Sequence, residues 1–345
     1  MIILSIDTSC DDTSAAVTDD AHVLSNVISS QVRYHKKYGG VVPFLAQRLH
    51  RERIRSVIQL ALSRSRVSWN EIEAVAVTYG PGLAPALEVG IATTKELARE
   101  RQLPVYAVNH MAGHIASCFA VLGTRPRDIR LPALALLVSG GHTELVLVKD
   151  EFRLEVLGET LDDALGEAYD KLAKMLNLGY PGGPVVATLA ERGNSTLYNL
   201  PVPMQKSGDL NFSYSGLKNA VRLLINNLKE LSGTPILNQQ QIQDICAGFE
   251  RVAHQSVVEK VEMAARLHPE IKSLLMAGGV AANTALRARL RRVSRQYGLA
   301  FYTPSNQKLC TDNAAMIGVA AYLGRVAGQS PVALETLDRM PGLHL

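Results

Sequence analysis

The sequence has few cysteines and no long hydrophobic run. Its four cysteines are widely separated and include no Cys-x-x-Cys pair, so the pattern predicts neither a zinc ribbon nor a disulfide framework. Reduced thiols in a cytosolic protein fit this spacing best. The short apolar run before Asp7 is not long enough for a signal peptide, and no other run has the length of a membrane span. We therefore expect a cytoplasmic protein that does not associate with a membrane.

Charge of one sign is not strongly in excess either. The chain has 36 Lys and Arg against 32 Asp and Glu, a net charge of +4, whereas a dedicated nucleic-acid binder usually carries a stronger basic footprint. The charge is therefore compatible with an RNA partner but does not require one. With 47% hydrophobic and 20% charged residues over 345 positions, the composition predicts a globular protein with sizeable cores and favours two packed lobes.

The order of the expected elements is repeated along the chain. Both halves begin with three short β-rich runs and continue with helices that alternate with strands. In the first half we expect strands in the runs ILSID, SAAVTD and VLSNVIS and at 74–78 and 105–108, with helices at 46–65 and 85–100. In the second half we expect strands at 131–140, 143–149, 153–159, 273–279 and 300–304, with helices at 161–177, 183–192, 214–231, 239–267, 282–297 and 312–327.

This repetition predicts an α/β fold of two duplicated lobes, each a mixed sheet flanked by helices. We place the N-terminal lobe at residues 1–125 and the C-terminal lobe, with a helical insertion, at 131–330; the Pro-, Arg- and Gly-rich segment 122–132 joins them. The last helix, 312–327, is expected to pack back on the N-terminal lobe. Duplicated lobes of this order are typical of the actin, sugar-kinase and Hsp70-like superfamily. By this analogy, we expect the active site in the interlobe cleft.

A pair of histidines follows the expected strand at 105–108. His110 and His114 are four residues apart, so on a helix both imidazoles lie on one face, where they can chelate one metal ion. Asp312 offers a carboxylate that would complete the coordination. The alternative is a pair of surface or packing histidines, which the spacing alone does not exclude. A zincin protease needs Glu directly after the first histidine, and Met111 occupies that position, so a metalloprotease is disfavoured.

Two polar turns occupy equivalent places in the two halves. The sequence Ser139-Gly140-Gly141 forms a turn between two strands, and such a turn exposes backbone N–H groups to phosphate oxygens. In the first half, the equivalent turn contains Asp11 and Asp12. One such turn in each lobe is what a phosphate clamp in a cleft requires, although a plain hairpin explains the glycines as well.

Further polar residues are candidates for contacts with nucleotide or RNA. Asn283 follows a glycine pair near the start of a helix and can offer a donor and an acceptor to a base or ribose; a simple strand–turn–helix connection is the alternative. Asp170 can accept hydrogen bonds from ribose hydroxyls, but a helical ion pair with Lys174 explains it equally well. Arginines in two helices are candidates for RNA phosphate contacts, or else lie on solvated helix faces: Arg48, Arg51, Arg53, Arg55, Arg287, Arg289, Arg291, Arg292 and Arg295.

Nine motifs occur in the order found in one family: DTSCDDTSAAV, YGGVVPFLAQRLH, GPGLAPALEVG, HMAGH, LVSGGHTELV, YPGGP, NFSYSGLK, AGGVAAN and CTDNAAMI. Over residues 2–328 the chain resembles the tRNA N6-adenosine threonylcarbamoyltransferase family (TsaD, formerly the O-sialoglycoprotein endopeptidase family), bacterial type. The resemblance implies an acyltransferase. It would transfer the threonylcarbamoyl group from threonylcarbamoyl-AMP to N6 of adenosine 37 in tRNAs reading ANN codons (t6A formation), releasing AMP.

The resemblance also implies roles for individual residues. His110, His114 and Asp312 would bind one divalent metal ion, with Fe²⁺ favoured and Zn²⁺ as the alternative. Asp11, Asp12 and Ser139 are expected to be catalytic. The substrate would be bound by Leu137, Val138, Ser139, Gly140, Gly141, Asp170, Gly183 and Asn283. The expected protein partners are an inactive paralogue of the same fold (TsaB) and a small ATPase (TsaE).

The chain departs from the family pattern at four positions. Asp7 and Asp12 stand where the family usually has Glu. Ala112 stands where bacterial members often have Glu, and Ala187 where many carry Asp. The metal triad and both glycine turns are intact, which favours an active enzyme. Two alternatives are a small-molecule kinase of the same superfamily, which would not need the two histidines, and a non-catalytic nucleotide-binding paralogue, which typically lacks them.

Overall fold

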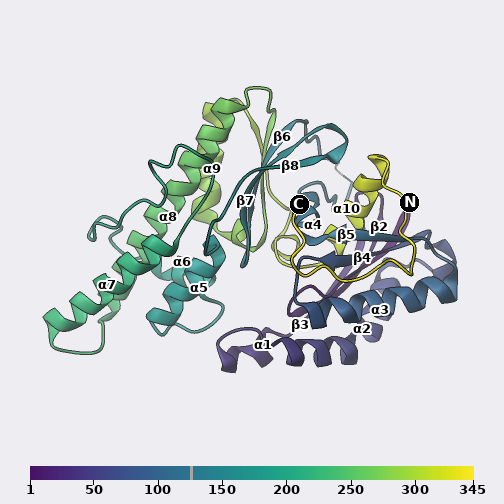
Figure 1. Cartoon of the computed structure of the whole chain (residues 1–345), viewed down its shortest axis with the longest axis horizontal. Coiled ribbons are helices and arrows are strands. Elements are labelled where there is room, and N and C mark those ends of the chain that lie inside the picture. Colours follow the sequence, from purple (N-terminus) through teal and green to yellow (C-terminus); the bar gives the residue numbers. More distant parts are fainter. Residues whose placement is uncertain (125–126) are drawn as a thin grey trace.

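The computed structural model describes residues 1–124 and 127–345, which form two lobes (Figure 1). Residues 125–126 of the predicted junction lie outside the described residues. Each lobe contains one five-stranded sheet, in which three strands form an antiparallel meander and two more run parallel to the first. The predicted α/β fold with two mixed sheets flanked by helices is therefore confirmed. None of the helices in the described part of the chain combines the length and apolar character needed to cross a membrane.

The strands of the N-terminal lobe are β1 (Ile2–Asp7), β2 (Asp12–Asp19), β3 (His22–Ser30), β4 (Ala74–Gly80) and β5 (Val105–Asn109). They are ordered β3-β2-β1-β4-β5 in the sheet. One face is covered by two long helices, α2 (Pro43–Ser65) and α3 (Ala84–Arg101), whose apolar residues share a core with β1 and β4. Short helical segments in this lobe are α1 (Val32–His35), η1 (Lys36–Tyr38) and η2 (Trp69–Glu71).

The opposite face of this sheet is covered by α10 (Ala314–Val326), which comes from near the end of the chain (Figure 1). The helix lies very close to the sheet at Gly318, because a Cβ there would be 2.6 Å from Thr18 Oγ1 and 3.0 Å from Ser5 Oγ. The Ser5 hydroxyl also donates to the backbone oxygen of Ala314 at 2.7 Å. The N-terminal core is thus closed by a helix that follows it by about three hundred residues in sequence.

In the C-terminal lobe the strands are β6 (Ala133–Val138), β7 (Thr143–Val148), β8 (Leu154–Glu159), β9 (Ser273–Ala277) and β10 (Ala300–Tyr302), ordered β10-β9-β6-β7-β8. Read from β8 to β10, this order matches that of the first sheet read from β3 to β5. The main core of the lobe lies under α5 (Leu165–Met175), α6 (Gly182–Ala190), α7 (Ser215–Ser232), α8 (Gln239–Leu267) and α9 (Thr284–Gln296). Short turns of 3₁₀ helix are η3 (Asp150–Phe152), η4 (Gly279–Ala282) and η5 (Gln307–Leu309).

One predicted helix is shorter than expected. The pattern predicts a helix over 161–177, whereas α5 spans Leu165–Met175. The side chain of Asp162 instead accepts hydrogen bonds from the backbone N–H groups of Tyr214 and Ser215, where α7 begins. These contacts compete with helix formation at residues 161–164 and connect this segment to α7.

Helix α4 (His110–Ala116) lies between the two sheets. The side chain of Asn109 caps it by accepting hydrogen bonds from the backbone N–H groups of Met111 and Ala112, at 2.8 and 3.4 Å. Met111 and Ile115 share a core with β6 and β9 of the C-terminal sheet, while Ala116 packs with the N-terminal sheet and α10. The predicted metal-binding histidines are therefore carried by a helix that both lobes hold.

The last residues of the chain run along the N-terminal lobe and end beside α4. The backbone N–H of Val332 donates to Val105 O at 2.8 Å, and that of Met340 donates to Tyr79 O at 2.7 Å. Nearer the end, Asn109 Nδ2 donates to the backbone oxygen of His344 at 3.0 Å. This C-terminal tail, residues 327–345, consequently reaches the junction between the lobes (Figure 1).

Candidate active site

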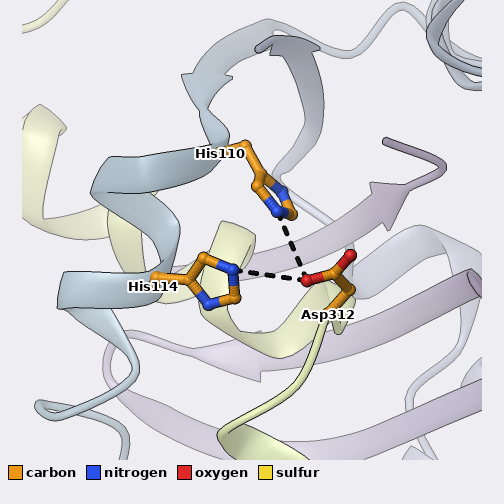
Figure 2. A group of neighbouring side chains, drawn as sticks. All are labelled: His110, His114 and Asp312. Carbon is orange, nitrogen blue, oxygen red and sulfur yellow. Dashed lines mark ion pairs between the residues drawn. The ribbon is translucent and has the colours of Figure 1, made fainter. Parts of the chain in front are cut away.

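The structure brings the three predicted metal ligands together at this junction (Figure 2). His110 and His114 project from successive turns of α4, and Asp312 comes from the loop that precedes α10. Asp312 Oδ1 lies 3.4 Å from His110 Nε2 and 3.3 Å from His114 Nε2. Both imidazoles are almost completely buried, at 6% and 1% exposed. Of the alternative of surface or packing histidines, this burial excludes the surface histidines, and metal binding stays a prediction.

The donor atoms of this cluster suit a divalent cation. Three candidate ligand atoms, one from each side chain, lie within 4.8 Å of one another. Among the described residues, neither ring nitrogen of His114 has a hydrogen-bond partner, and buried polar atoms seldom remain unpaired. Two imidazoles and one carboxylate form a donor set suited to iron or zinc. Asp7 Oδ1 lies 3.7 Å from His110 Nδ1, which is beyond hydrogen-bond distance but close enough for its charge to act on the imidazole.

Burial and neighbouring charges shift the pKa values of the three side chains in this cluster. Burial alone would lower the pKa of His110, but the carboxylates of Asp312 and Asp7 outweigh burial and raise this pKa to about 10. Burial lowers the pKa of His114, and the nearby His110 lowers it further. Burial would raise the pKa of Asp312, but the two histidines hold it below its ordinary value. Since an imidazole must be neutral to bind a metal, an ion would displace a proton from His110.

The acidic turn of the N-terminal lobe lies beside this cluster. Burial raises the pKa of Asp11, and the nearby Asp312 carboxylate raises it further. Burial likewise raises the pKa of Asp12, to about 7, with additional contributions from Asp312 and Asp11. Asp11 Oδ2 and Asp12 Oδ1 are buried without a hydrogen-bond partner among the described residues. The two predicted catalytic carboxylates therefore lie close to the metal cluster, and together with it they make this region strongly acidic.

The glycine turn of the C-terminal lobe connects β6 to β7. It is closed by the backbone N–H of Ser139, which donates to His142 O at 2.9 Å, and by that of His142, which donates to Ser139 Oγ at 3.1 Å. A Cβ at Gly140 or Gly141 would meet nothing within 4 Å, so the turn is open to a ligand. Such a turn can hold a phosphate group.

A cavity of about 340 Å³ lies next to this turn. Four of the predicted substrate-binding residues line it: Gly140, Asp170, Gly183 and Asn283. Leu137 and Val138 do not line it, because their side chains are fully buried in the core of β6. Any contribution of these two residues to binding therefore comes from the backbone. The volume of the cavity is typical of a small-molecule site.

Two polar residues of this cavity already have partners in the protein. Asp170 Oδ1 accepts a hydrogen bond from the backbone N–H of Gly182 at 2.7 Å, which fixes the start of α6. Asn283 Oδ1 caps α9 by accepting from the backbone N–H of Leu286 at 2.9 Å. Asn283 Oδ1 keeps a second lone pair that it can offer to a ligand, whereas Nδ2 is engaged with Glu250 Oε1 at 2.7 Å and the Tyr169 hydroxyl at 3.5 Å.

Sequence reasoning missed the residues that hold Asn283 in place. Its Nδ2 donates to Glu250 Oε1 at 2.7 Å, and the hydroxyl of Tyr169 donates to the same oxygen at 2.9 Å. That hydroxyl also lies 2.9 Å from His254 Nε2. Glu250 and His254 are on α8 and far from every motif, so no local pattern in the sequence indicates this network.

The arginines predicted to contact RNA are in several different environments. Arg287 hydrogen-bonds to the backbone oxygen of Ala281 and to Cys310 Sγ, so it stabilises the loop near the metal cluster. On α2, Arg55 forms an ion pair with Glu96 at 2.6 Å, and its side chain is exposed. A role in RNA binding remains a prediction for these residues.

The two mixed-sheet lobes with matching strand orders define a protein of the actin, sugar-kinase and Hsp70-like class. The fold is similar to that of the activator of 2-hydroxyisocaproyl-CoA dehydratase from Clostridium difficile with bound ADPNP, with a TM-score of 0.52, 15% identity and coverage of 95% of this chain and 96% of that chain. It is also similar to HypF from T. kodakarensis, with a TM-score of 0.59, 15% identity and coverage of 94% of this chain and 47% of that chain.

Sequence comparison identifies the family. The model of TsaD, tRNA N6-adenosine threonylcarbamoyltransferase, matches residues 22–319. Proteins of that name are 42% identical in Thermosipho melanesiensis, with all of both chains covered, and 43% identical in Bacillus subtilis, with 100% of this chain and 96% of the relative covered. The protein of that name in Geobacter metallireducens is 45% identical, with 99% and 97% covered. The chain belongs to the tRNA N6-adenosine threonylcarbamoyltransferase family, as the nine motifs predict.

Proposed function

We propose that the chain transfers the threonylcarbamoyl group of threonylcarbamoyl-AMP to N6 of adenosine 37 in tRNAs reading ANN codons and releases AMP. The observation that carries this proposal is the open Ser139–Gly141 turn, which borders a nucleotide-sized cavity at Gly140. It is followed by His142, whose pKa is lowered by burial and by the nearby His110 and His114 of the buried His-His-Asp cluster. Within this family, that arrangement can hold an acyl-adenylate with its phosphate at the turn and its acyl carbon toward the cluster.

The residues around the turn supply what the reaction requires. The acyl-phosphate anhydride is already activated, so the protein needs no nucleophilic side chain of its own. N6 of the adenosine attacks the carbonyl carbon, the new C–N bond forms, and the bond from that carbon to the phosphate oxygen breaks. The Ser139–Gly141 backbone amides stabilise charge on the departing phosphate. Asp12, whose pKa is raised to about 7, is suited to accept the proton that N6 loses.

The metal cluster supports the same chemistry. His110, His114 and Asp312 would hold one divalent ion, with Fe²⁺ favoured over Zn²⁺. Such an ion acts as a Lewis acid toward a carbonyl or phosphoryl oxygen. The carboxylate of Asp7, 3.7 Å from His110 Nδ1, adds negative charge beside this ligand set.

Partners follow from the family. We expect the chain to act with TsaB and TsaE on unmodified tRNA in the cytoplasm. The acyl donor, threonylcarbamoyl-AMP, is supplied by a separate enzyme.

A reconstituted transfer assay tests the function. Purified chain, TsaB, TsaE, threonylcarbamoyl-AMP and unmodified ANN-decoding tRNA are combined, and the modified adenosine is measured by mass spectrometry. His110→Ala is expected to lower the rate about a hundredfold, because it removes a metal ligand. His22→Ala, which changes an exposed histidine, is the matched control and should react like the wild type. If the folded wild-type chain forms no modified adenosine with competent partners, the proposal is wrong.

A further inference from the structure

A second cavity, of about 450 Å³, lies at the junction of the lobes. It shares no lining residue with the nucleotide cavity, but the two meet at the glycine turn: Gly140 lines the first and Gly141 the second. Met111, which follows the metal ligand His110 on α4, also lines the second cavity. The two cavities therefore approach the same reaction centre through different residues.

Three parts of the chain build this second cavity. Pro81, Gly82 and Met111 come from the N-terminal lobe, and residues 341–345 come from the tail. The C-terminal lobe contributes residues 141–144 and, at and after the end of β8, Glu159, Thr160 and Asp162. The tail is held there by its backbone, because the N–H of Gly82 donates to Pro341 O at 3.2 Å and Asn109 Nδ2 donates to His344 O. Since Asn109 also caps α4, one side chain fixes both the metal-binding helix and a wall of the cavity.

The cavity contains a buried carboxylate without a partner. Glu144 is 8% exposed, and its Oε2 has no hydrogen-bond partner among the described residues. It lies opposite Glu159 in the pairing of β7 with β8. Two other acids line the cavity: Glu159, which is exposed, and Asp162, which is already bonded to Ser213, Ser215 and the start of α7. Glu144 is thus the buried carboxylate of this wall that remains available to a ligand.

The chemistry of this wall fits an adenine base. Buried polar groups are rarely left unpaired, so a free carboxylate oxygen beside a cavity indicates a hydrogen-bond donor in the ligand. Adenine carries such a donor in its N6 amino group. A phosphate or a carboxylate would be repelled by Glu144 and Glu159, so the charge of the cavity argues against both the AMP part and the threonine carboxylate of the acyl donor.

We propose that this second cavity is the acceptor pocket, which receives the adenine of the target tRNA nucleotide with Glu144 accepting a hydrogen bond from its N6 amino group. The inference rests on the proposed function and adds the site of the second substrate. In this arrangement the acyl donor and the acceptor base enter from opposite sides of the Ser139–Gly141 turn. The target nucleotide must leave the stack of its loop to enter the pocket, as bases do in other enzymes that modify them.

Filling each cavity separately tests the assignment. Gly342 lines the acceptor pocket and Gly183 the nucleotide cavity, and at both positions a Cβ would meet nothing within 4 Å. Gly342→Trp should leave the affinity for AMP and for threonylcarbamoyl-AMP within twofold of the wild type, while kcat/KM for tRNA falls at least thirtyfold. Gly183→Trp should weaken AMP binding at least tenfold. If Gly342→Trp retains full transfer, or weakens threonylcarbamoyl-AMP but not AMP, the cavity does not receive the acceptor base.

A binding cycle tests the contact of Glu144 without requiring turnover. The full chain with its partners is titrated with an ANN-type anticodon stem-loop RNA that carries either adenine or unsubstituted purine, which lacks the N6 amino group, at the target position. For the wild type, the purine RNA should bind about tenfold more weakly than the adenine RNA. For Glu144→Leu the two RNAs should bind within twofold of each other, and Glu144→Gln, which keeps an acceptor oxygen, should fall between. An undiminished preference in Glu144→Leu would overturn the contact.

The two experiments also separate this inference from the proposed function. The acceptor pocket alone is contradicted if the wild type transfers the acyl group, Gly342→Trp transfers it equally well, and Glu144→Leu keeps the wild-type preference for adenine RNA. A folded wild type that forms no modified adenosine contradicts both.

Discussion

The buried carboxyl of Glu144 should make the stability of the protein depend on pH, and Glu144→Gln should remove this dependence. Burial and, to a smaller extent, the nearby Glu159 together raise the pKa of Glu144 from 4.5 to about 7. Each unit of pKa change corresponds to about 1.4 kcal/mol, so ionised Glu144 costs the folded state about 3 kcal/mol. Gln has nearly the same shape and carries no charge, so it avoids this cost.

The sign follows from the two states of the chain. Below pH 4.5 the carboxyl is neutral in both folded and unfolded protein, so Glu144 does not lower the stability of the fold there. Between pH 4.5 and about 7 the unfolded chain releases this proton more readily than the folded one, so stability falls as the pH rises. The gain from Glu144→Gln should therefore grow from about 1 kcal/mol at pH 5 to about 3 kcal/mol at pH 8.5.

Urea unfolding followed by circular dichroism at several pH values between 5 and 8.5 measures this gain. Glu230→Gln on α7 changes an exposed glutamate and is the matched control, for which no gain that grows with pH is expected. A gain for Glu144→Gln that is the same at all pH values, or a loss of stability that increases with pH, would refute the reasoning. Either result would mean that Glu144 is ionised in the folded protein without a penalty.

Three more outcomes follow from the site. Zn²⁺ binding at pH 8 should release about one proton per ion, because His110 has a pKa of about 10 and must become neutral to bind. Calorimetry in two buffers of different ionisation enthalpy measures the released protons. Equal heats of binding in the two buffers would contradict the prediction. Asp170→Ala should weaken AMP binding about tenfold, since the hydrogen bond that fixes the start of α6 is lost, and an unchanged Kd would show that this contact does not shape the cavity. Gly278→Ala should lower the free energy of unfolding by about 2 kcal/mol or more, because φ is +90° and the new Cβ would lie 2.3 Å from Val138 O. Gly279→Ala is its control, with nothing within 4 Å of the new Cβ, and equal losses in both variants would contradict the steric argument.

The sequence predicted the fold well because its signals were local. Runs of β-branched residues and helical spacing place each strand and helix, and the repeated order of the elements implies two matching sheets. The spacing of His110 and His114 is likewise a local signal, since four residues make one helical turn. Asp312 could be offered as the third ligand, but its distance from the histidines depends on how α10 packs on the N-terminal lobe.

Features of the site that depend on tertiary packing could not be predicted from local patterns in the sequence. Leu137 and Val138 belong to a binding motif, yet their side chains face the core, because a central strand is buried on both faces. Asn283 caps α9 through Oδ1 and is bonded to Glu250 through Nδ2, two contacts that its motif does not indicate. Glu144 occurs in a strand motif in which nothing indicates an unpaired carboxylate. Only the approach of the tail and the N-terminal lobe encloses it.

The position of α10 has a consequence for how the protein is made. His114 leaves the ribosome 198 residues before Asp312, since 312 − 114 = 198. At about 5–20 residues per second, the nascent chain spends on the order of 10–40 s with two histidines and no third ligand. During this time one face of the first sheet, including Ile3 and Ala16, lacks the helix that will cover it. Chaperones that bind exposed apolar surface therefore have a defined interval in which to act.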